Sequence, residues 1–397
     1  MDIDFSRAHG KLGQSGEREL MVARRRKKRR KAKAPKVRPE PIQERAVAAE
    51  ENMVERGALT IQQRELIDTI EGFRKSKLVV MVLKEGVSLR DGICRPLYQQ
   101  LRKLGKQDRL DLLLSSRGGS SEVPAKVVSL LRGFGANIGA LIPYRAHSAA
   151  THIAIGADEI VMGDLSELSS VDPRRGHPLL PPNPQDPDKP LMISVQDLRH
   201  CMAFVKKEAE GDLPPEAMVG VYKALFDKVD PLALGAIERS YDLSKQVTAK
   251  ILETHMHPEK DKDRIEELAN LLSDHYKSHL LQIGWKEAKD FLGLNVTYDE
   301  GELYESMIRL LELYEETFQV ERAMEIEIAG QRVSGLARPI IWLDTSASRC
   351  WSEELFERTV RAGRRAEERI IRQRWVEEDW PTQPEESSAG EVGSQSQ

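Results

Sequence analysis

Cysteine and long apolar runs are scarce in this 397-residue chain. The three cysteines, Cys94, Cys201 and Cys350, lie far apart and form no C-x-x-C or Cys/His ligand spacing. This usage is typical of a reducing compartment and indicates no disulfide framework. No stretch of about 18 apolar residues occurs, and the first residues lack the apolar core of a signal peptide. We therefore expect no membrane span and a cytoplasmic protein.

Several cofactor motifs are also missing from the sequence. It contains no G-x-x-x-x-G-K-S/T, no G-x-G-x-x-G after a strand, no H-E-x-x-H and no EF-hand loop. The histidines are too scattered to indicate a zinc site. We expect neither a cofactor nor a metal, and any use of ATP would need a separate partner.

Charge is nearly balanced overall but uneven along the chain. Acidic residues number 64 and basic residues 60, so the net charge of -4 argues against nucleic-acid binding as the main purpose. Residues 1–56 nevertheless contain ARRRKKRRKAKAPKVRPEP, which predicts a disordered basic arm. This arm is either a solubilising tail or a docking segment for nucleic acid, an acidic partner or an acidic membrane surface. Residues 376–397 are of low complexity and predict a disordered tail.

Helical and strand-like patterns alternate in the first half of the chain. Apolar spacing typical of helices recurs between short buried runs typical of strands, which are KLVVMVL, LDLLLSS, NIGALIP and EIVMG. Such alternation predicts repeated βαβ units and a mostly parallel sheet covered on both faces. The predicted class is α/β, with residues 57–300 forming the main domain.

The C-terminal half is expected to be mainly helical. A proline-rich loop follows Arg174 and is too long for a simple connector, so we expect it to be functional or mobile. Helical periodicity then resumes and continues to about residue 300. Residues 301–375 predict a helical extension with a short strand pair at IEIAGQRV and ARPIIWLD, and a last charged helix over 352–375.

Two special residue groups follow neighbouring strands. Gly118 and Gly119 let the backbone turn sharply and expose N–H groups that could form an oxyanion hole, with the N–H of Ala149 as a further donor. Ser148 stands where a strand gives way to a helix of small residues. Each feature also has a plain explanation, a glycine turn or an N-cap serine. Together they favour acyl transfer, because that chemistry needs a nucleophile and oxyanion donors at one carbonyl.

The segments LLLSSRGG, AHSAATHIAIGADEIVMG, SSVDPR and SHLLQIGWKEAKDFLGL resemble the serine dehydrogenase proteinase family, which is related to the Clp protease subunit and signal peptide peptidase A groups. The resemblance covers roughly residues 60–300. It implies the Clp protease/crotonase-like fold, a Ser148 nucleophile, oxyanion donation from the Gly118-Gly119 turn and a homo-oligomer. It thus implies a serine-type endopeptidase, a hydrolase of polypeptide substrates.

The general base stays open between three residues. A serine hydroxyl is a weak nucleophile without an adjacent base. His279 matches a histidine of the family pattern, Lys189 falls at the distance of the signal peptide peptidase lysine, and His177 is the nearest candidate for a Clp-type histidine, with Asp172 beside it.

Two other function classes compete with the peptidase. One is a catalytically lapsed Clp-fold scaffold that docks through its basic arm. It is favoured by departures from the family pattern, which fall at Arg117, Ala150, Ser169, Ser170 and Arg174. The other is a crotonase-type acyl-CoA enzyme, which is disfavoured because paired glutamates are missing from the expected strand ends.

Overall fold

The computed structural model describes residues 59–173, 176–208, 214–276, 278, 281–328, 330–359 and 367–381. The expected basic arm, residues 1–56, lies outside these ranges, as does the expected tail beyond residue 381. The chain separates into two units, residues 1–48 and 49–397, and all described residues belong to the second.

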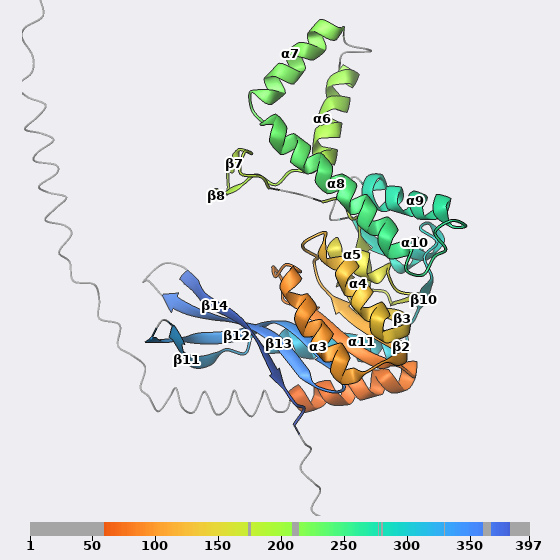
Figure 1. Ribbon diagram of the computed structural model, residues 1–397, viewed down its shortest axis with the longest axis vertical. Coiled ribbons are helices and arrows are strands. Elements are labelled where there is room, and N and C mark those ends of the chain that lie inside the picture. Colours follow the sequence, from red (N-terminus) through yellow and green to blue (C-terminus); the bar gives the residue numbers. More distant parts are fainter. Residues whose placement is uncertain are drawn as a thin grey trace, which may run out of the picture. The chain divides into compact units, whose positions relative to one another are not determined.

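Five parallel strands form the centre of the fold (Figure 1). Their order across the sheet is β10-β5-β3-β2-β1, and each pairs with its neighbour in parallel. The strands are β1 (Lys77–Leu83), β2 (Gln107–Ser115), β3 (Gly135–Ile142), β5 (Glu159–Met162) and β10 (Val296–Tyr298). The expected α/β class with repeated βαβ units is confirmed.

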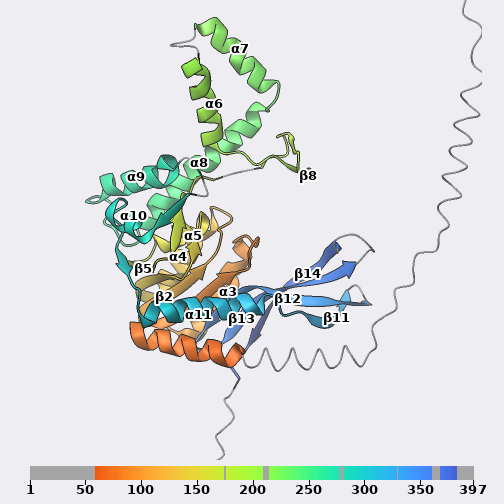
Figure 2. The same cartoon turned by 180° about the vertical axis from the view of Figure 1, so that it is seen from behind.

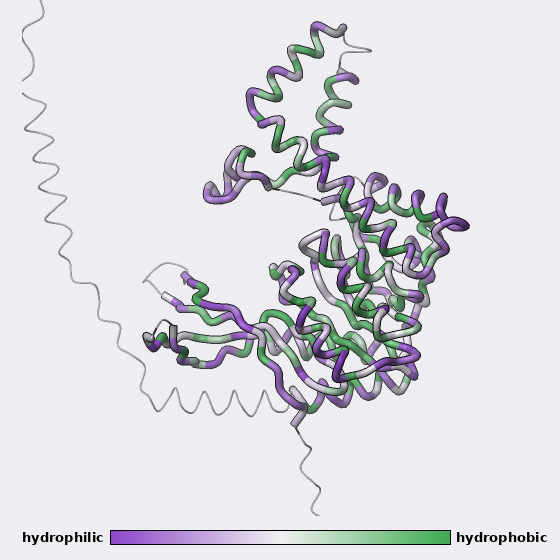
Figure 3. Tube along the Cα trace, in the orientation of Figure 1, coloured by the Kyte–Doolittle hydropathy of each residue, from purple (hydrophilic) through white to green (hydrophobic). Residues whose placement is uncertain are grey.

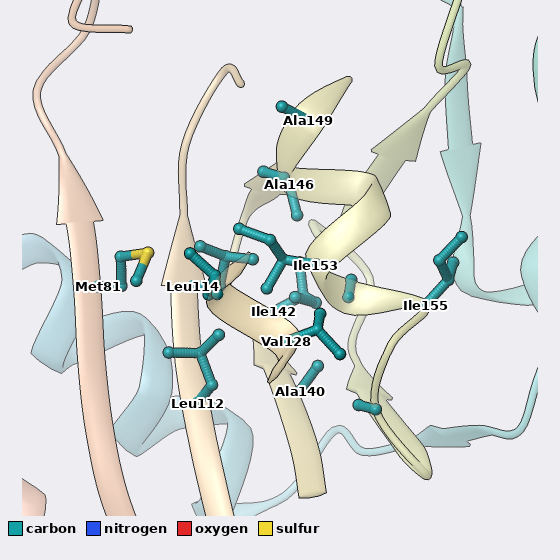
Figure 4. Packing of buried hydrophobic residues seen from close by; sticks show 14 of the residues in the cluster. Met81, Leu112, Leu114, Val128, Ala140, Ile142, Ala146, Ala149, Ile153 and Ile155 are labelled. Carbon is teal, nitrogen blue, oxygen red and sulfur yellow. The ribbon is translucent and has the colours of Figure 1, made fainter. Parts of the chain in front are cut away.

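Both faces of this sheet are buried, which explains the continuous apolar runs of its strands. Successive residues of β1 alternate between two cores: Val79 and Met81 join one, and Val80 and Val82 join the other. The crossover helices α3 (Cys94–Leu104), α4 (Val123–Phe134) and α5 (Ala149–Ala154) cover the first face. Figure 4 shows Leu112, Leu114 and Met81 packed in this core near Val128 of α4 and Ile153 of α5.

Helix α11 (Glu302–Thr317) and the helical residues 59–74 cover the second face of the sheet (Figure 2). Ile67, Ile70 and Tyr314 are fully buried there against β1. The side chain of Gln63 ties the two helices together by donating a hydrogen bond of 3.3 Å to Leu313 O.

A smaller region combines β4, which precedes β5, with elements that lie between β5 and β10 in sequence. A three-stranded sheet is formed by β4 (Arg145–Ala146), β6 (Glu167–Ser169) and β9 (Gln282–Gly284). The proline-rich stretch forms a two-stranded hairpin, and Leu180 just before it packs with Val195 and Ile237.

The remaining elements are η2 (Asp91–Ile93), β7 (Pro182–Asn183), β8 (Asp186–Pro190), α6 (Val195–Glu208), α7 (Pro215–Phe226), α8 (Pro231–Leu252), α9 (Lys262–Asn270), the π-helix η3 (Leu271–His275) and α10 (Trp285–Asp290).

The last part of the chain differs from expectation. The expected strand pair is present as β11 (Arg322–Ile328) and β12 (Gln331–Thr345), but the helix expected over 352–375 is wrong. Its described residues, 352–359 and 367–375, fall in β13 (Arg349–Thr359) and β14 (Glu367–Glu378). Strand β12 joins β1 antiparallel and so extends the central sheet.

Charge pairing explains why this segment resembled a helix. Its alternating Glu and Arg residues suit i,i+4 helical pairs, yet they pair across strands instead. Arg374 Nε lies 2.7 Å from Glu353 Oε1, and Arg358 Nε lies 3.0 Å from Glu368 Oε1. Figure 3 shows hydrophilic and hydrophobic stretches alternating along the strands of this part of the chain. Strand β14 also extends to Glu378, within the segment 376–397 expected to be a disordered tail. Just beyond the strand, the Trp380 indole N–H donates to Thr345 O at 2.8 Å.

Within the described part of the chain, no helix combines the length and the apolar character needed to cross a membrane.

Glu159, at the start of β5, gives a testable pH dependence. Burial alone would raise its pKa, but hydrogen bonds from Arg74, Thr297 and Arg109 outweigh that effect and lower the pKa from 4.5 to about 2. A lowered folded-state pKa stabilises the fold above pH 4.5, and the stabilisation is lost as the pH falls toward 2. We expect Glu159→Gln to lower the free energy of unfolding by about 2 kcal/mol at pH 7.

Urea unfolding at several pH values measures this effect. The gap between wild type and Glu159→Gln should narrow steadily below pH 4.5. Glu65→Gln, an exposed glutamate on the 59–74 helix, is the matched control and should change stability little at any pH. A gap that does not depend on pH would contradict the assigned ionic role.

Candidate active site

Ser148 stands at the N-cap of α5 in an unusual backbone conformation. Its φ is 51° and its ψ is -116°, whereas among the described non-glycine residues only Lys75 shares a positive φ. Such a conformation is costly for a residue with a Cβ and persists only where the surroundings enforce it. The Ser148 side chain caps no helical N–H, so the N-cap explanation does not describe its hydroxyl. Ser148 is half-buried at the carboxyl edge of the sheet.

The Gly118 turn lies directly against this serine. Gly118 has a φ of 90°, and a Cβ built on it would lie 2.5 Å from His147 O and 2.9 Å from both Ala149 N and Ser148 Cβ. No side chain fits in that space, since real Cβ contacts are essentially never below 3.0 Å. The two segments that the sequence placed at neighbouring strand ends are therefore in backbone contact.

Backbone hydrogen bonds join the two strand ends just before these residues. Ser116 N donates to Arg145 O at 3.0 Å, and His147 N donates to Ser116 O at 3.0 Å. On the other side of the turn, Gly119 lies directly against Leu89, and a Cβ built on Gly119 would lie 2.2 Å from Leu89 O. Leu89 N donates to Gly118 O at 2.8 Å, and Ser120 N donates to Leu89 O at 2.9 Å. The glycine turn is thus held between the Leu89 loop and the serine.

The orientation of the N–H groups changes the expected oxyanion hole. Gly118 N donates to Ser116 Oγ at 3.0 Å, so this N–H is already engaged within the turn. Within the described ranges, the N–H groups of Gly119 and Ala149 donate to no other group. Ala149 is the first residue of α5, where an N–H has no helical partner. In the described structure the N–H groups of Gly119 and Ala149 therefore stay available as donors, and that of Gly118 does not.

Ser169 supports the strained serine, a role that sequence reasoning missed. Its Oγ accepts a 2.8 Å hydrogen bond from Ser148 N and donates to Ser170 O at 2.9 Å. Ser169 N in turn donates to Thr151 Oγ1 at 3.1 Å, and Thr151 Oγ1 donates to Ala146 O at 2.6 Å. In the sequence Ser169 is a departure from the family pattern, and its contact with Ser148 arises only when β6 pairs with β4.

A buried histidine–carboxylate pair lies beside the serine. His147 Nε2 is 3.0 Å from Glu167 Oε1, and both side chains are about nine-tenths buried. Burial raises the pKa of Glu167, although Arg145 and Arg117 oppose that shift. This pair joins the residue before Ser148 to β6, and no local pattern in the sequence predicts that contact.

The expected bases are placed very differently. Lys189 lies on β8 with a side chain that is 74% exposed, and its ion pair with Asp186 at 2.7 Å raises its pKa. Such a lysine stays protonated, which is the opposite of what a base requires. His177 Nδ1 accepts a turn hydrogen bond of 3.2 Å from Leu179 N. His279 lies outside the described residues.

His152 is the remaining histidine on α5. Burial lowers its pKa to about 4, so the imidazole is neutral at pH 7. Its Nε2 lies 2.8 Å from Thr248 Oγ1 on α8, whose hydroxyl donates to Ser244 O. Across the described ranges, no side chain hydrogen-bonds to the Ser148 hydroxyl. Those same ranges hold no group of three or more His, Cys, Asp or Glu side chains suited to a metal ion.

Comparisons with known proteins give limited matches. No family model matches the chain. The uncharacterized protein MJ0137 of Methanocaldococcus jannaschii is 21% identical over 229 residues, which are 58% of this chain and 66% of that protein. The chain therefore spans about two thirds of the length of that relative.

Two solved structures are also similar, both of variants of 1510-N, a membrane-bound stomatin-specific protease. The first has 11% identity and a TM-score of 0.32 and covers 62% of this chain and 86% of that one. The second, a complex with a substrate peptide, has 14% identity and a TM-score of 0.29 and covers 62% and 79%. Scores this low define neither the fold nor the activity of this chain.

Gly118→Ala tests the close contact between the turn and the serine. The new Cβ would meet backbone atoms and force alanine into a positive φ, so we expect the free energy of unfolding to fall by about 2–4 kcal/mol. Gly133→Ala in α4 is the control, because a Cβ there meets nothing within 4 Å. It should be neutral or stabilising by up to about 1 kcal/mol in urea unfolding. Equal changes in the free energy of unfolding for Gly118→Ala and Gly133→Ala would contradict the close contact between the Gly118 turn and Ser148.

Ser169→Ala tests the support of the strained backbone. It leaves the Ser148 N–H without its acceptor in a buried place, so we expect a loss of about 1–3 kcal/mol in the same measurement. Ser129→Ala, an exposed serine on α4, should change stability by less than about 0.5 kcal/mol. If Ser169→Ala left the free energy of unfolding unchanged, Ser169 would not be what supports the strained backbone of Ser148.

Proposed function

We propose that this chain is a serine-type peptidase of the Clp protease/crotonase-like fold, in which Ser148 is the nucleophile. The observation that carries the proposal is the contact between the strained Ser148 and the Gly118-Gly119 turn. A strained backbone at a strand-to-helix junction is characteristic of functional positions, where other contacts offset its cost. The family resemblance of the sequence adds support from residues 60–300.

The proposed reaction uses the geometry of the two strand ends. Ser148 Oγ attacks the carbonyl carbon of a peptide bond, and the N–H groups of Gly119 and Ala149 bind the oxygen as it becomes negative. Donation from the first N–H of α5 is favourable for an anion, because the amino end of a helix carries partial positive charge. Gly118 contributes by its size, since any side chain there would displace the serine.

The base takes the hydroxyl proton and later returns it to the leaving amine. We propose His279 for this role on the family pattern. Lys189 and His177 are the lesser candidates, because Lys189 is exposed and ion-paired and His177 is engaged in a turn. The proposal includes polypeptide substrates, a cytoplasmic location and a homo-oligomer. It also includes an acidic partner or nucleic acid for the basic arm.

One observation favours a second function, a Clp-fold scaffold without catalysis. No described residue hydrogen-bonds to the Ser148 hydroxyl, and a serine without a base would be inert. In that case the strained turn would be a remnant of an active site, and the protein would act through its surfaces and its basic arm.

A fluorophosphonate probe separates the two functions. We expect the wild type to be labelled covalently and to hydrolyse an unfolded polypeptide such as casein. Ser148→Ala should abolish labelling and lower hydrolysis by roughly 10³-fold or more. Ser129→Ala is the control and should keep both activities. Absence of labelling in a folded wild-type protein would favour the scaffold, and undiminished hydrolysis by Ser148→Ala would exclude Ser148 as nucleophile.

Single alanine variants at His279, Lys189 and His177 identify the base by the rate of probe labelling. We expect His279→Ala to slow labelling by at least about 100-fold, because general-base catalysis contributes about that much. Lys189→Ala and His177→Ala should label nearly as fast as the wild type. A wild-type rate in His279→Ala would assign the base elsewhere.

A further inference from the structure

A pocket of about 220 Å³ lies at the carboxyl ends of β1 and β2, beside the end of α11. Leu83 and Phe318 are apolar residues of its lining, and Ser115 and Ser116 line it at the end of β2. Its volume is below the range of about 300–1,000 Å³ that is usual for drug-sized ligands and cofactors. It therefore suits a single side chain better than a nucleotide or an acyl-CoA.

Three cationic side chains from three strand ends line this pocket. They are Lys84 after β1, Arg117 after β2 and Arg145 on β4, and the carboxylates among the lining residues are Glu85 and Glu315. With both carboxylates ionised the lining carries one net positive charge, the difference between three cations and two anions. A carboxylate ligand that displaces Glu85 keeps this net charge, because it replaces one anion by another.

The side chains of Arg145 and Lys84 are held in place more firmly than the side chain of Glu85, which pairs with Arg145 and Arg117. Arg145 is 17% exposed, and its guanidinium lies 4.0 Å from the centre of the Tyr144 ring. Lys84 Nζ donates to Phe318 O at 3.2 Å. Glu85 bridges Arg117 at 2.5 Å and Arg145 at 3.2 Å, yet its own side chain is 66% exposed. Because exposed ion pairs contribute only about 0–1 kcal/mol, a second carboxylate can replace Glu85 at little cost.

The pocket shares its backbone with the serine turn. Ser116 and Arg117 immediately precede Gly118, and the hydrogen bonds between Ser116 and the β4 segment join the pocket to the turn. Arg145 is three residues before Ser148, which is at most about 10 Å along an extended chain. An extended peptide spans that distance with three residues.

We propose that this pocket takes the carboxylate of an aspartate or glutamate side chain in the peptide that Ser148 attacks, within about three residues of the cleaved bond. The inference rests on the proposed peptidase function and adds a preference for acidic residues. Arg145 and Arg117 pair with the substrate carboxylate, and Lys84 adds positive charge at the back of the pocket. Glu85 occupies the place of that carboxylate when no peptide is bound.

Quenched fluorescent peptides test the preference in the full-length protein. Each of six positions around the cleaved bond carries Glu in one peptide and the uncharged isostere Gln in its partner. We expect kcat/KM for the Glu peptide to exceed that for the Gln peptide about tenfold or more at one position, since hydrogen bonds to charged groups are worth about that factor. The ratio should fall toward one in Arg145→Gln and should rise in Glu85→Gln.

Two further variants keep the test decisive. Arg309→Gln removes an exposed arginine of α11 that lies outside the pocket, and the Glu/Gln ratio should stay at the wild-type value. If Arg145→Gln does not fold, as judged by circular dichroism, Arg117→Gln replaces it, because that side chain is 44% exposed. A ratio near one at all six positions in the wild type, or an unchanged ratio in the folded pocket variants, overturns the proposal.

Binding to the Ser148→Ala protein separates this proposal from the peptidase function. Fluorescence anisotropy with the same peptides should show tighter binding of the Glu peptide, and the difference should disappear in Ser148→Ala/Arg145→Gln. Probe labelling together with equal binding of both peptides would refute the preference of the pocket for acidic residues. The same result would still support the peptidase function. Selective binding of the Glu peptide without any probe labelling would support a pocket for acidic peptides and would contradict the proposed hydrolysis.

Discussion

The candidate site depends on one close contact, that between the Gly118 backbone and the turn at His147, Ser148 and Ala149. Because Gly118 has no Cβ, the two strand ends approach until their backbones touch. The approach leaves the N–H groups of Gly119 and Ala149 without partners in the described structure. A larger residue at 118 would push the Ser148 turn away from the glycine turn even if every other contact were kept.

The strain at Ser148 is maintained by polar contacts from outside its own βα unit. Ser169, on β6, accepts from the Ser148 N–H, and the His147–Glu167 pair fixes the preceding residue to the same strand. The three-stranded sheet of β4, β6 and β9 therefore holds Ser148 in its strained conformation, and the central parallel sheet supplies the edge at which Ser148 lies. Rigid support of this kind is what a preorganised site requires.

The same sheet edge also explains the neighbouring pocket. Parallel strands end at one edge, so the residues that follow β1 and β2 line a pocket whose backbone continues into the Gly118 turn. Arg145 belongs to both features, since its carbonyl accepts from Ser116 N and its guanidinium faces the pocket. The positions of Ser148 and of the charged pocket are thus consequences of one topological arrangement.

The sequence by itself determined the α/β class, the order of the first βαβ units and the positions of Gly118-Gly119 and Ser148, because apolar periodicity and glycine placement are local signals. Only the tertiary structure decided which N–H groups stay open, that Ser169 supports the serine, and that residues 352–359 and 367–375 form strands. Those outcomes depend on partners far along the chain. Cross-strand pairs such as Arg374 with Glu353 look like helical pairs until the register of the sheet is known.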